Sequence, residues 1–308
     1  MSPYDRPVTK SEQPVIIEVA INGLKSKRDN PHVPVDPAEI AADALACVEA
    51  GAAIVHNHID RYGLTEQEAA DRYLEGWRPV LDQRPDALLY PTIHFSDGLS
   101  YEHEIPLAAS GLSRVGIVDP GSVNLGGVDA TGVPAGGIVY ANSYDTIARA
   151  FEICQQQRLG PSMAIYEPGF LQTVVAWWRA GRLPAGSMIK LYFSSTTGYM
   201  GAPFGLPATA TALDAYLEIL GDCDVPWAVS LVGGDLIAGE LAGLALERGG
   251  HLHVGLEFYG GDRQPSNVEL VTEAVERCAE AGRPVASPDQ AAAILGLPRA
   301  GIEGPTGG

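Results

Sequence analysis

The chain has 308 residues, of which 46 % are apolar and 19 % charged, and its formal net charge is −18 at pH 7. This acidic balance disfavours binding to nucleic acid, which requires a basic surface, and adhesion to an anionic membrane. It does not exclude an anionic substrate, because a metal ion and a few basic residues can dominate the local field. No apolar run approaches the about 20 residues of a membrane span, and the four cysteines form no CxxC pair. We therefore expect a cytoplasmic protein with reduced thiols.

Short apolar runs alternate with helix-like stretches along most of the chain, which is the pattern of an α/β protein. The predicted strands are Val15–Ile21, Ala52–His58, Ala87–Phe95, Arg114–Val118, Met163–Glu167, Met188–Phe193, Trp227–Val232 and His253–Phe258. The helix-like stretches are Pro37–Ala50, Glu66–Arg78, Ile105–Gly111, Tyr144–Gln157, Gly169–Gly181, Ala208–Leu220, Asp235–Arg248 and Val268–Glu280. A further strand-like stretch at Gly137–Tyr140 is expected to be a loop or an edge strand.

Eight strand–helix units in this length predict a (β/α)₈ TIM barrel, and a doubly wound open sheet is the alternative. The sequence contains no internal repeat and no Pro/Ser-rich linker, so we expect a single barrel domain over residues 14–308. The polar segment 1–13 has no signal-peptide core and is expected to be flexible. In such a barrel, functional side chains gather at the C-terminal ends of the strands.

The most informative motif is the pair His56 and His58, which ends the second predicted strand. Because side chains alternate along a strand, residues two apart project together. Two imidazoles that project together form half of a divalent metal site. The alternative is a pair of partly exposed histidines at the start of a loop.

Glu257 is the third candidate ligand. In the last predicted strand, the same alternation places it on one face with His253. That face points toward the barrel axis, so Glu257 is expected to meet the two histidines near the mouth. Two histidines and a glutamate with an open fourth position form a catalytic zinc site. The alternative is a loop carboxylate that pairs with a nearby arginine such as Arg263.

Several longer motifs carry a resemblance to a known family. They are Asn22–Leu24, Arg28–Glu39, Glu49–His58, Asp119–Asn124, Tyr166–Gly169, Gly249–Glu257, Ser266–Val271 and Arg283–Pro288. Taken in this order, from about Ile16 to Leu297, they make the chain resemble the β-keto acid cleavage enzyme family, whose founding activity is 3-keto-5-aminohexanoate cleavage. The resemblance implies a zinc-dependent (β/α)₈ barrel that converts a β-keto acid and acetyl-CoA into acetoacetate and a new CoA ester. It implies one Zn²⁺ per chain, bound by His56, His58 and Glu257, and a homo-oligomer.

Other active-site positions of that family are changed here. The resemblance implies an arginine, an aspartate and a glutamate at the positions of His253, Phe258 and Ala164. Phenylalanine and alanine cannot take a proton, and histidine has neither the permanent charge nor the fork of donors of arginine. The metal ligands are retained, whereas the groups that would work beside the metal are not.

Some polar residues near the predicted strand ends are expected to contact a substrate. They are Ser96, which matches a substrate-contacting serine of the family, Lys25, Asn22 and Asp119. Lys25 lies near where amine-cleaving members carry a glutamate, so a cation there suits a substrate tail that bears a carboxylate; the alternative is a solvated lysine. His253 is the candidate catalytic base or a fourth metal ligand, and the alternative is a hydrogen-bonded histidine without a role in proton transfer.

Three functions therefore stay open at this stage. The first is a zinc-dependent enzyme that exchanges acyl groups between a β-keto acid and acetyl-CoA. The second is a diverged zinc-dependent lyase or hydrolase, and the third is a non-catalytic metal-binding homologue. The changed positions favour the last two, and the complete ligand set favours an enzyme.

Overall fold

The structure is a computed structural model and describes residues 13–95 and 98–298. Eight parallel strands follow one another in space in the order β3-β2-β1-β13-β12-β10-β9-β6. Their bounds are β1 (Ile17–Ala20), β2 (Ile54–Asn57), β3 (Leu88–Pro91), β6 (Val115–Val118), β9 (Gly160–Ile165), β10 (Met188–Ser194), β12 (Trp227–Val232) and β13 (His251–Val254). The first and last of these strands, β1 and β13, are hydrogen-bonded, and the two ends of the order, β3 and β6, lie side by side. The sheet is therefore a nearly closed barrel, which confirms the predicted (β/α)₈ fold over the open-sheet alternative.

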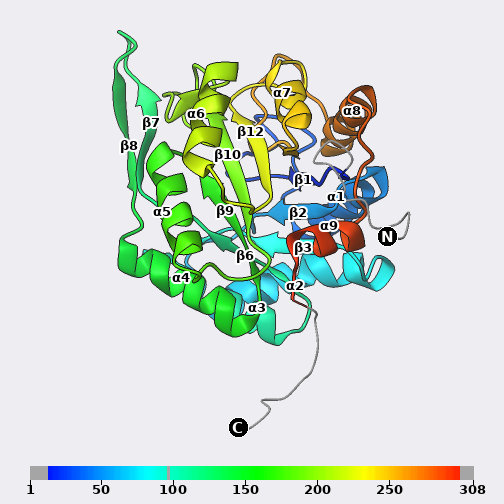
Figure 1. Cartoon of the computed structure of the whole chain (residues 1–308). Helices are drawn as coiled ribbons and strands as arrows, with labels where there is room; N and C mark the ends of the chain where they lie inside the picture. Colours follow the sequence, from blue (N-terminus) through cyan, green and yellow to red (C-terminus); the bar gives the residue numbers. More distant parts are fainter. Residues whose placement is uncertain (1–12, 96–97, 299–308) are drawn as a thin grey trace, which may run out of the picture.

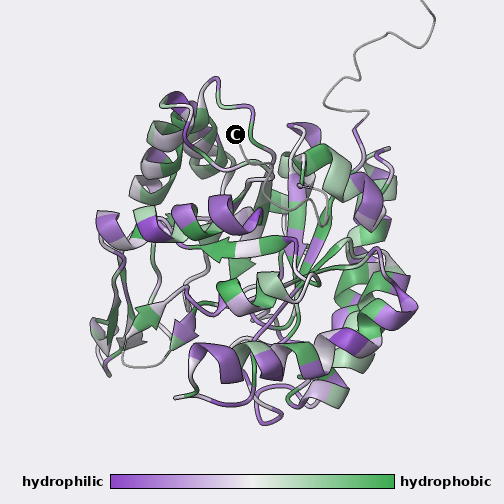
Figure 2. Ribbon diagram, turned by 90° about the horizontal axis from the view of Figure 1, so that it is seen from below, coloured by the Kyte–Doolittle hydropathy of each residue, from purple (hydrophilic) through white to green (hydrophobic). Residues whose placement is uncertain are grey.

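Helices pack around the outside of this barrel (Figure 1). They are α1 (Pro37–Ala50), α2 (Glu66–Gln83), α3 (Glu104–Ala109), α4 (Tyr144–Gln157), α5 (Pro168–Arg179), α6 (Ala210–Leu220), α7 (Leu241–Glu247), α8 (Asn267–Glu280) and α9 (Pro288–Leu295). In Figure 2 the strands are mostly apolar, and most helices alternate between apolar and polar residues, as expected for helices with one face against a core. Within the two described ranges, none of these helices is both long enough and apolar enough to cross a membrane.

The capping residues explain which helix bounds the sequence predicts well. Asp36 accepts hydrogen bonds from the backbone N–H groups of Ala38 and Glu39, and Ser143 accepts one from Thr146, so α1 and α4 have the predicted bounds. The predicted end of α2 at Arg78 is wrong, because the helix continues through Pro79 to Gln83. The prediction of a helix from residue 235 to 248 is wrong in its first part, where α7 begins only at Leu241, and α9 was not predicted.

A β-hairpin, formed by β7 (Val123–Val128) and β8 (Pro134–Tyr140), projects from the barrel at the left edge of Figure 1. Only its last residues, 137–140, had a strand-like sequence. Short strands β4 (His94–Phe95) and β5 (Leu99–Ser100) form a second small ladder, and β11 (Leu206–Pro207) pairs with β10. The predicted flexible segment 1–13 lies, except for Gln13, outside the described residues.

Candidate metal centre

The side chains of His56, His58 and Glu257 meet at the C-terminal end of the barrel. Nε2 of His56 lies 3.4 Å from Oε2 of Glu257, and Nε2 of His58 lies 3.2 Å from Oε1 of the same carboxylate. One ligand atom from each residue lies within 4.8 Å of the other two, and all three side chains are buried. The structure therefore brings together the three residues that the sequence predicts as metal ligands.

Asn22 fixes the backbone that carries His58. Its Oδ1 accepts hydrogen bonds from the backbone N–H groups of His58 and Gly23, each at 2.8 Å. Its Nδ2 donates to the carbonyl oxygens of His58 and Pro34 at 3.0 and 3.2 Å. Because its amide group already makes four hydrogen bonds within the chain, Asn22 acts here as a support for the metal centre. A contact between Asn22 and substrate stays a prediction.

The backbone around Glu257 differs from the predicted strand. Strand β13 covers residues 251–254, so the predicted strand over His253–Phe258 is wrong in both of its bounds. Gly255 ends the strand with φ +126°, and a Cβ atom there would lie 2.2 Å from the carbonyl oxygen of Ala20. The chain then makes a turn in which the N–H of Glu257 donates to Ala20. Glu257 faces the histidines because of this turn and not because of strand alternation.

The unpartnered atoms of the triad fit a bound cation. Across residues 13–95 and 98–298, Nε2 of His58 and Oε2 of Glu257 have no hydrogen-bond partner, although both are buried. Buried polar atoms are rarely left without a partner, so a missing ligand is a natural explanation. Two imidazole nitrogens and a carboxylate oxygen are ligands that Zn²⁺ accepts in catalytic sites.

The charge states of the triad also suit a metal. Burial lowers the pKa of His56 to about 3, so its imidazole is neutral at pH 7. Burial alone would raise the pKa of Glu257, but His58 and His56 beside it outweigh this effect and hold the pKa at about 2. Metal ligands must be deprotonated, and both of these side chains are deprotonated near neutral pH.

A buried ion pair lies deeper in the barrel, beneath the triad. Nζ of Lys190 lies 3.3 Å from Oε1 of Glu18 and donates to the hydroxyl of Tyr90 at 2.6 Å. The hydroxyl of Tyr90 in turn donates to Glu18. The ring of Tyr90 packs on the ring of His56 with 4.5 Å between centroids. The ion pair therefore supports one face of the metal centre while its charges satisfy each other.

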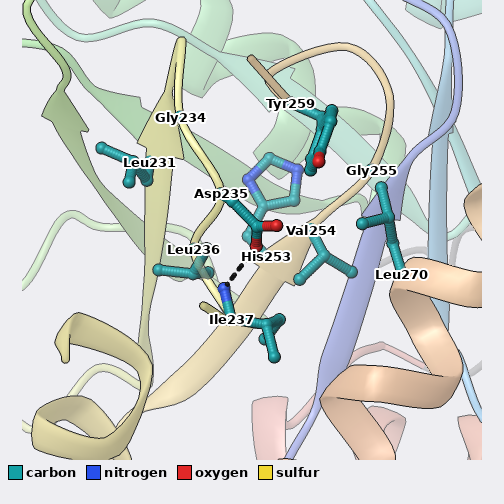
Figure 3. A pocket seen from close by; sticks show the side chains of 10 residues that line it. All are labelled: Leu231, Gly234, Asp235, Leu236, Ile237, His253, Val254, Gly255, Tyr259 and Leu270. Carbon is teal, nitrogen blue, oxygen red and sulfur yellow. Dashed lines mark hydrogen bonds between the residues drawn. The ribbon is translucent and has the colours of Figure 1, made fainter. Parts of the chain in front are cut away.

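His253 lies beside this ion pair, with Nε2 3.4 Å from Oε1 of Glu18, and is fully buried. It also lines a cavity of about 20 Å³ that includes Leu231, Asp235 and Tyr259 (Figure 3). A cavity of this size holds about one water molecule and is too small for a keto acid. Burial and the charge of Lys190 lower the pKa of His253, so its imidazole is neutral. A role for His253 as the catalytic base stays a prediction.

Two other predicted residues lie near the mouth of the barrel. Lys25 is half-buried and its ammonium group donates to the carbonyl oxygen of Tyr259. Burial lowers the pKa of Lys25, and the charges of Asp29 and Glu257 oppose that shift. Asp119 follows β6 and is buried. The predicted substrate contact Ser96 lies outside the described residues.

Four side chains at this centre are not predicted from the sequence: Glu18, Tyr90, Lys190 and Tyr199. Tyr199 places its hydroxyl 3.4 Å from Oε1 of Glu257. Glu18 and Lys190 each interrupt an otherwise apolar predicted strand, and a charged residue inside a buried strand is a signal that it has a partner. The signal does not say which residue across the barrel the partner is.

Comparisons with known proteins find relatives in sequence and a solved structure with a similar fold. A 3-oxoadipate:acetyl-CoA acetyltransferase from Cupriavidus necator is 29 % identical over 299 residues, which cover 95 % of this chain and 98 % of the relative. A 3-keto-5-aminohexanoate cleavage enzyme from Fusobacterium nucleatum is 26 % identical and covers 92 % of this chain and 98 % of its own length. Among solved structures, the apo structure of ObcA has a TM-score of 0.63 at 16 % identity; the match covers 87 % of this chain and 66 % of ObcA, just under two thirds of its length. This last likeness concerns the fold alone.

A family model described as beta-keto acid cleavage enzyme matches residues 14–297. The match includes every strand of the barrel and all three residues of the candidate metal centre. The chain therefore belongs to the β-keto acid cleavage enzyme family.

Proposed function

We propose that this enzyme cleaves a β-keto acid by acyl exchange with acetyl-CoA, and that it releases acetoacetate and the CoA ester of the remaining acid. We further propose that it binds one Zn²⁺ per chain through His56, His58 and Glu257. The observation that carries the proposal is the convergence of these three buried side chains, of which His58 and Glu257 have ligand atoms without hydrogen-bond partners in the described part of the chain. Family membership and the names of its relatives support the reaction class.

When bound, the zinc ion would act as a Lewis acid toward the keto and carboxylate oxygens of the substrate. Aromatic residues of the chain would surround the reacting carbons of the substrate. The rings of Phe258 and Tyr192 lie 5.0 Å apart between centroids, and those of Tyr192 and Tyr166 also lie 5.0 Å apart. This aromatic wall begins directly beside Glu257 and helps to exclude water, which would otherwise hydrolyse a thioester.

The position of Lys25 favours a substrate that has a second carboxylate at the end far from the keto group. Its half-buried ammonium group lies at the mouth, close enough to Glu257 for the two charges to interact. A partly desolvated cation binds a carboxylate more strongly than an exposed one does. The relative from Cupriavidus necator acts on 3-oxoadipate according to its name, and that β-keto acid has a carboxylate at both ends. We propose a dicarboxylic β-keto acid of this kind as the substrate.

The experiment is a turnover assay with zinc-loaded protein. 3-Oxoadipate and 3-keto-5-aminohexanoate are each incubated with and without acetyl-CoA, and acetoacetate and CoA esters are measured by mass spectrometry. Formation of both products only with acetyl-CoA supports the proposal. Turnover without acetyl-CoA would indicate a diverged lyase or hydrolase, and binding without turnover a non-catalytic homologue. A homo-oligomer in the cytoplasm also stays an expectation, and light scattering measures its mass.

A further inference from the structure

The proposed exchange requires a base, and one of the buried carboxylates in the described part of the chain is available for that role. A β-keto acid reacts with a thioester only after it loses a proton from C2, the carbon between its two carbonyl groups. Four carboxylates are buried among the described residues: Glu18, Glu104, Asp119 and Glu257. Glu257 is a proposed metal ligand, and Glu18 is paired with Lys190.

Glu104 lies outside the barrel wall, where its carboxylate accepts a hydrogen bond from the backbone N–H of Ile117 and contacts Cys154 of α4. An added Cβ on Gly116 would lie 3.0 Å from both oxygens of Glu104, so Gly116 faces outward toward α3 and α4. Side chains alternate along a strand, so Ile117 faces the barrel interior. Asp119 directly follows the end of β6 at Val118, and its carboxylate interacts with the charges of Lys190 and Glu257, which places it on the interior side. It is the remaining buried carboxylate.

The surroundings of Asp119 hold one of its oxygens and leave the other free. Oδ2 accepts a hydrogen bond from the hydroxyl of Tyr140, and the backbone N–H of Asp119 donates to the hydroxyl of Tyr101 at 3.2 Å. Oδ1 is buried and has no hydrogen-bond partner in the described ranges. On the neighbouring strand β9, Met163 pairs with Val118, which places the small side chain of Ala164 next to Asp119. The backbone of Ala164 also lies close to the carboxylate of Asp119 and favours its ionised form.

The charges around Asp119 connect it to the metal centre. Burial raises the pKa of Asp119 to about 6, and the charge of Glu257 also raises it, whereas the hydrogen bond from Tyr140, the charge of Lys190 and the backbone N–H of Ala164 lower it. Among the described residues, Tyr101, Tyr166 and Tyr192 are further titratable groups close to this carboxylate. Lys190 lies on β10 and Glu257 in the turn after β13, so Asp119 faces the same interior as they do. A base with a pKa just below neutral is ionised at pH 7 and still accepts a proton readily.

We propose that Asp119 is the general base of the reaction and that Tyr140 positions its carboxylate. In this scheme, which rests on the proposed function, Oδ1 of Asp119 removes a proton from C2 of the β-keto acid. The resulting enolate carbon forms a bond to the acetyl carbonyl carbon, and the CoA thiolate leaves. The thiolate then attacks the original keto carbon, the bond between this carbon and C2 breaks, and a CoA ester and the enolate of acetoacetate form. Asp119 returns its proton to this enolate, so no proton or electron is left over.

The test is the exchange of the C2 protons of the β-keto acid in D₂O, measured by NMR with zinc-loaded protein in the absence of acetyl-CoA. We expect Asp119→Asn to slow the protein-catalysed exchange and kcat/KM by at least about 100-fold, since a general base contributes about 10²–10⁴-fold. Zinc content and substrate dissociation constant should stay unchanged. The matched control is Asp129→Asn, because Asp129 lies in the exposed turn of the hairpin, and this variant should behave as the wild type.

Tyr140→Phe provides a second readout that leaves Asp119 in place. Because the hydrogen bond from Tyr140 lowers the pKa of Asp119, its removal should move the acid limb of the kcat/KM profile to higher pH. Exchange by Asp119→Asn within 3-fold of the wild type, or an acid limb that does not move in Tyr140→Phe, would overturn the assignment of Asp119 alone. A wild-type protein that catalyses neither exchange nor turnover would overturn the proposed function and this inference with it.

Discussion

Gly23 lies directly against the carboxylate side chain of Glu257: a Cβ atom on Gly23 would be 2.3 Å from Cγ of Glu257. No real Cβ atom approaches a neighbour so closely, so a side chain at position 23 must displace Glu257. Gly23 also has φ +61°, which glycine adopts without strain. The motif after the first strand therefore contributes to the metal centre without providing a ligand.

Gly23→Ala is expected to weaken zinc binding by about 10–100-fold, the range found when residues that position metal ligands are changed. Gly63→Ala is the matched control, because Gly63 has φ +71° but open space around its Cα. Both variants have similar backbone strain, and only the first moves Glu257. Competition with a chromophoric chelator measures the zinc dissociation constant. Equal affinity in both variants would show that Gly23 does not hold Glu257.

The ion pair between Glu18 and Lys190 predicts a large loss of stability when one charge is removed. Lys190→Met leaves the carboxylate of Glu18 buried without its cation, and breaking such a pair costs about 3–5 kcal/mol of unfolding free energy. The double variant Glu18→Gln/Lys190→Met removes both charges and should recover part of that loss. Urea unfolding of the wild type and the variants measures these differences. A double variant that is no more stable than Lys190→Met would argue against charge pairing as the reason.

Glu104 predicts a particular pH dependence of stability. Burial raises the pKa of Glu104 from 4.5 to about 8. Since the folded state then holds the proton more tightly than the unfolded state, protonated Glu104 contributes to the free energy of unfolding. This contribution is fully present below pH 4.5 and is lost as pH rises through 8. The slope is about 1.4 kcal/mol per pH unit in that interval. Glu104→Gln should flatten the stability profile between pH 5 and 8, whereas Glu152→Gln, at an exposed position of α4, should leave it unchanged. An identical slope in both variants would disprove the assignment.

Lys25 predicts the charge of the preferred substrate tail. Lys25→Glu reverses the sign of the charge at the mouth, and we expect kcat/KM for a dicarboxylic β-keto acid to fall by about 10–100-fold, or about 1.4–2.7 kcal/mol in transition-state binding. The same variant should gain activity toward 3-keto-5-aminohexanoate, whose tail is an amine. Lys27→Glu is the control, because Lys27 points to Glu39 at the surface. If both variants have the same substrate preference, Lys25 does not contact the tail.

Local patterns predict much of this protein, and contacts across the barrel account for the rest. Asp36 and Ser143 define helix starts through their own hydrogen bonds, so the bounds of α1 and α4 follow from the sequence. His56 lies on β2 and His58 directly follows its end, and both imidazoles face Glu257, as alternation predicts. Glu257 reaches them through a turn that depends on contact between Gly255 and Ala20, residues far apart in the chain. Such a contact leaves no periodic signal.

The pairing of Glu18 with Lys190 depends in the same way on the closure of the barrel. The sequence of each strand shows a charged residue in an apolar run. Because β1 and β10 are far apart in the sequence, it does not show that these two residues pair with each other. The same holds for Asp119. The sequence predicts its position after β6, but its hydrogen bond with Tyr140 depends on the unpredicted β7–β8 hairpin.

The most direct test of the metal centre is the zinc content of the purified protein, determined by plasma mass spectrometry together with that of His58→Ala and Glu257→Gln. The proposed zinc site predicts about one zinc ion per chain in the wild type and nearly none in either variant, while the circular dichroism spectrum keeps its barrel signature. A wild-type protein without metal, or variants that retain a full equivalent, would contradict the assignment of His56, His58 and Glu257 as the metal-binding residues.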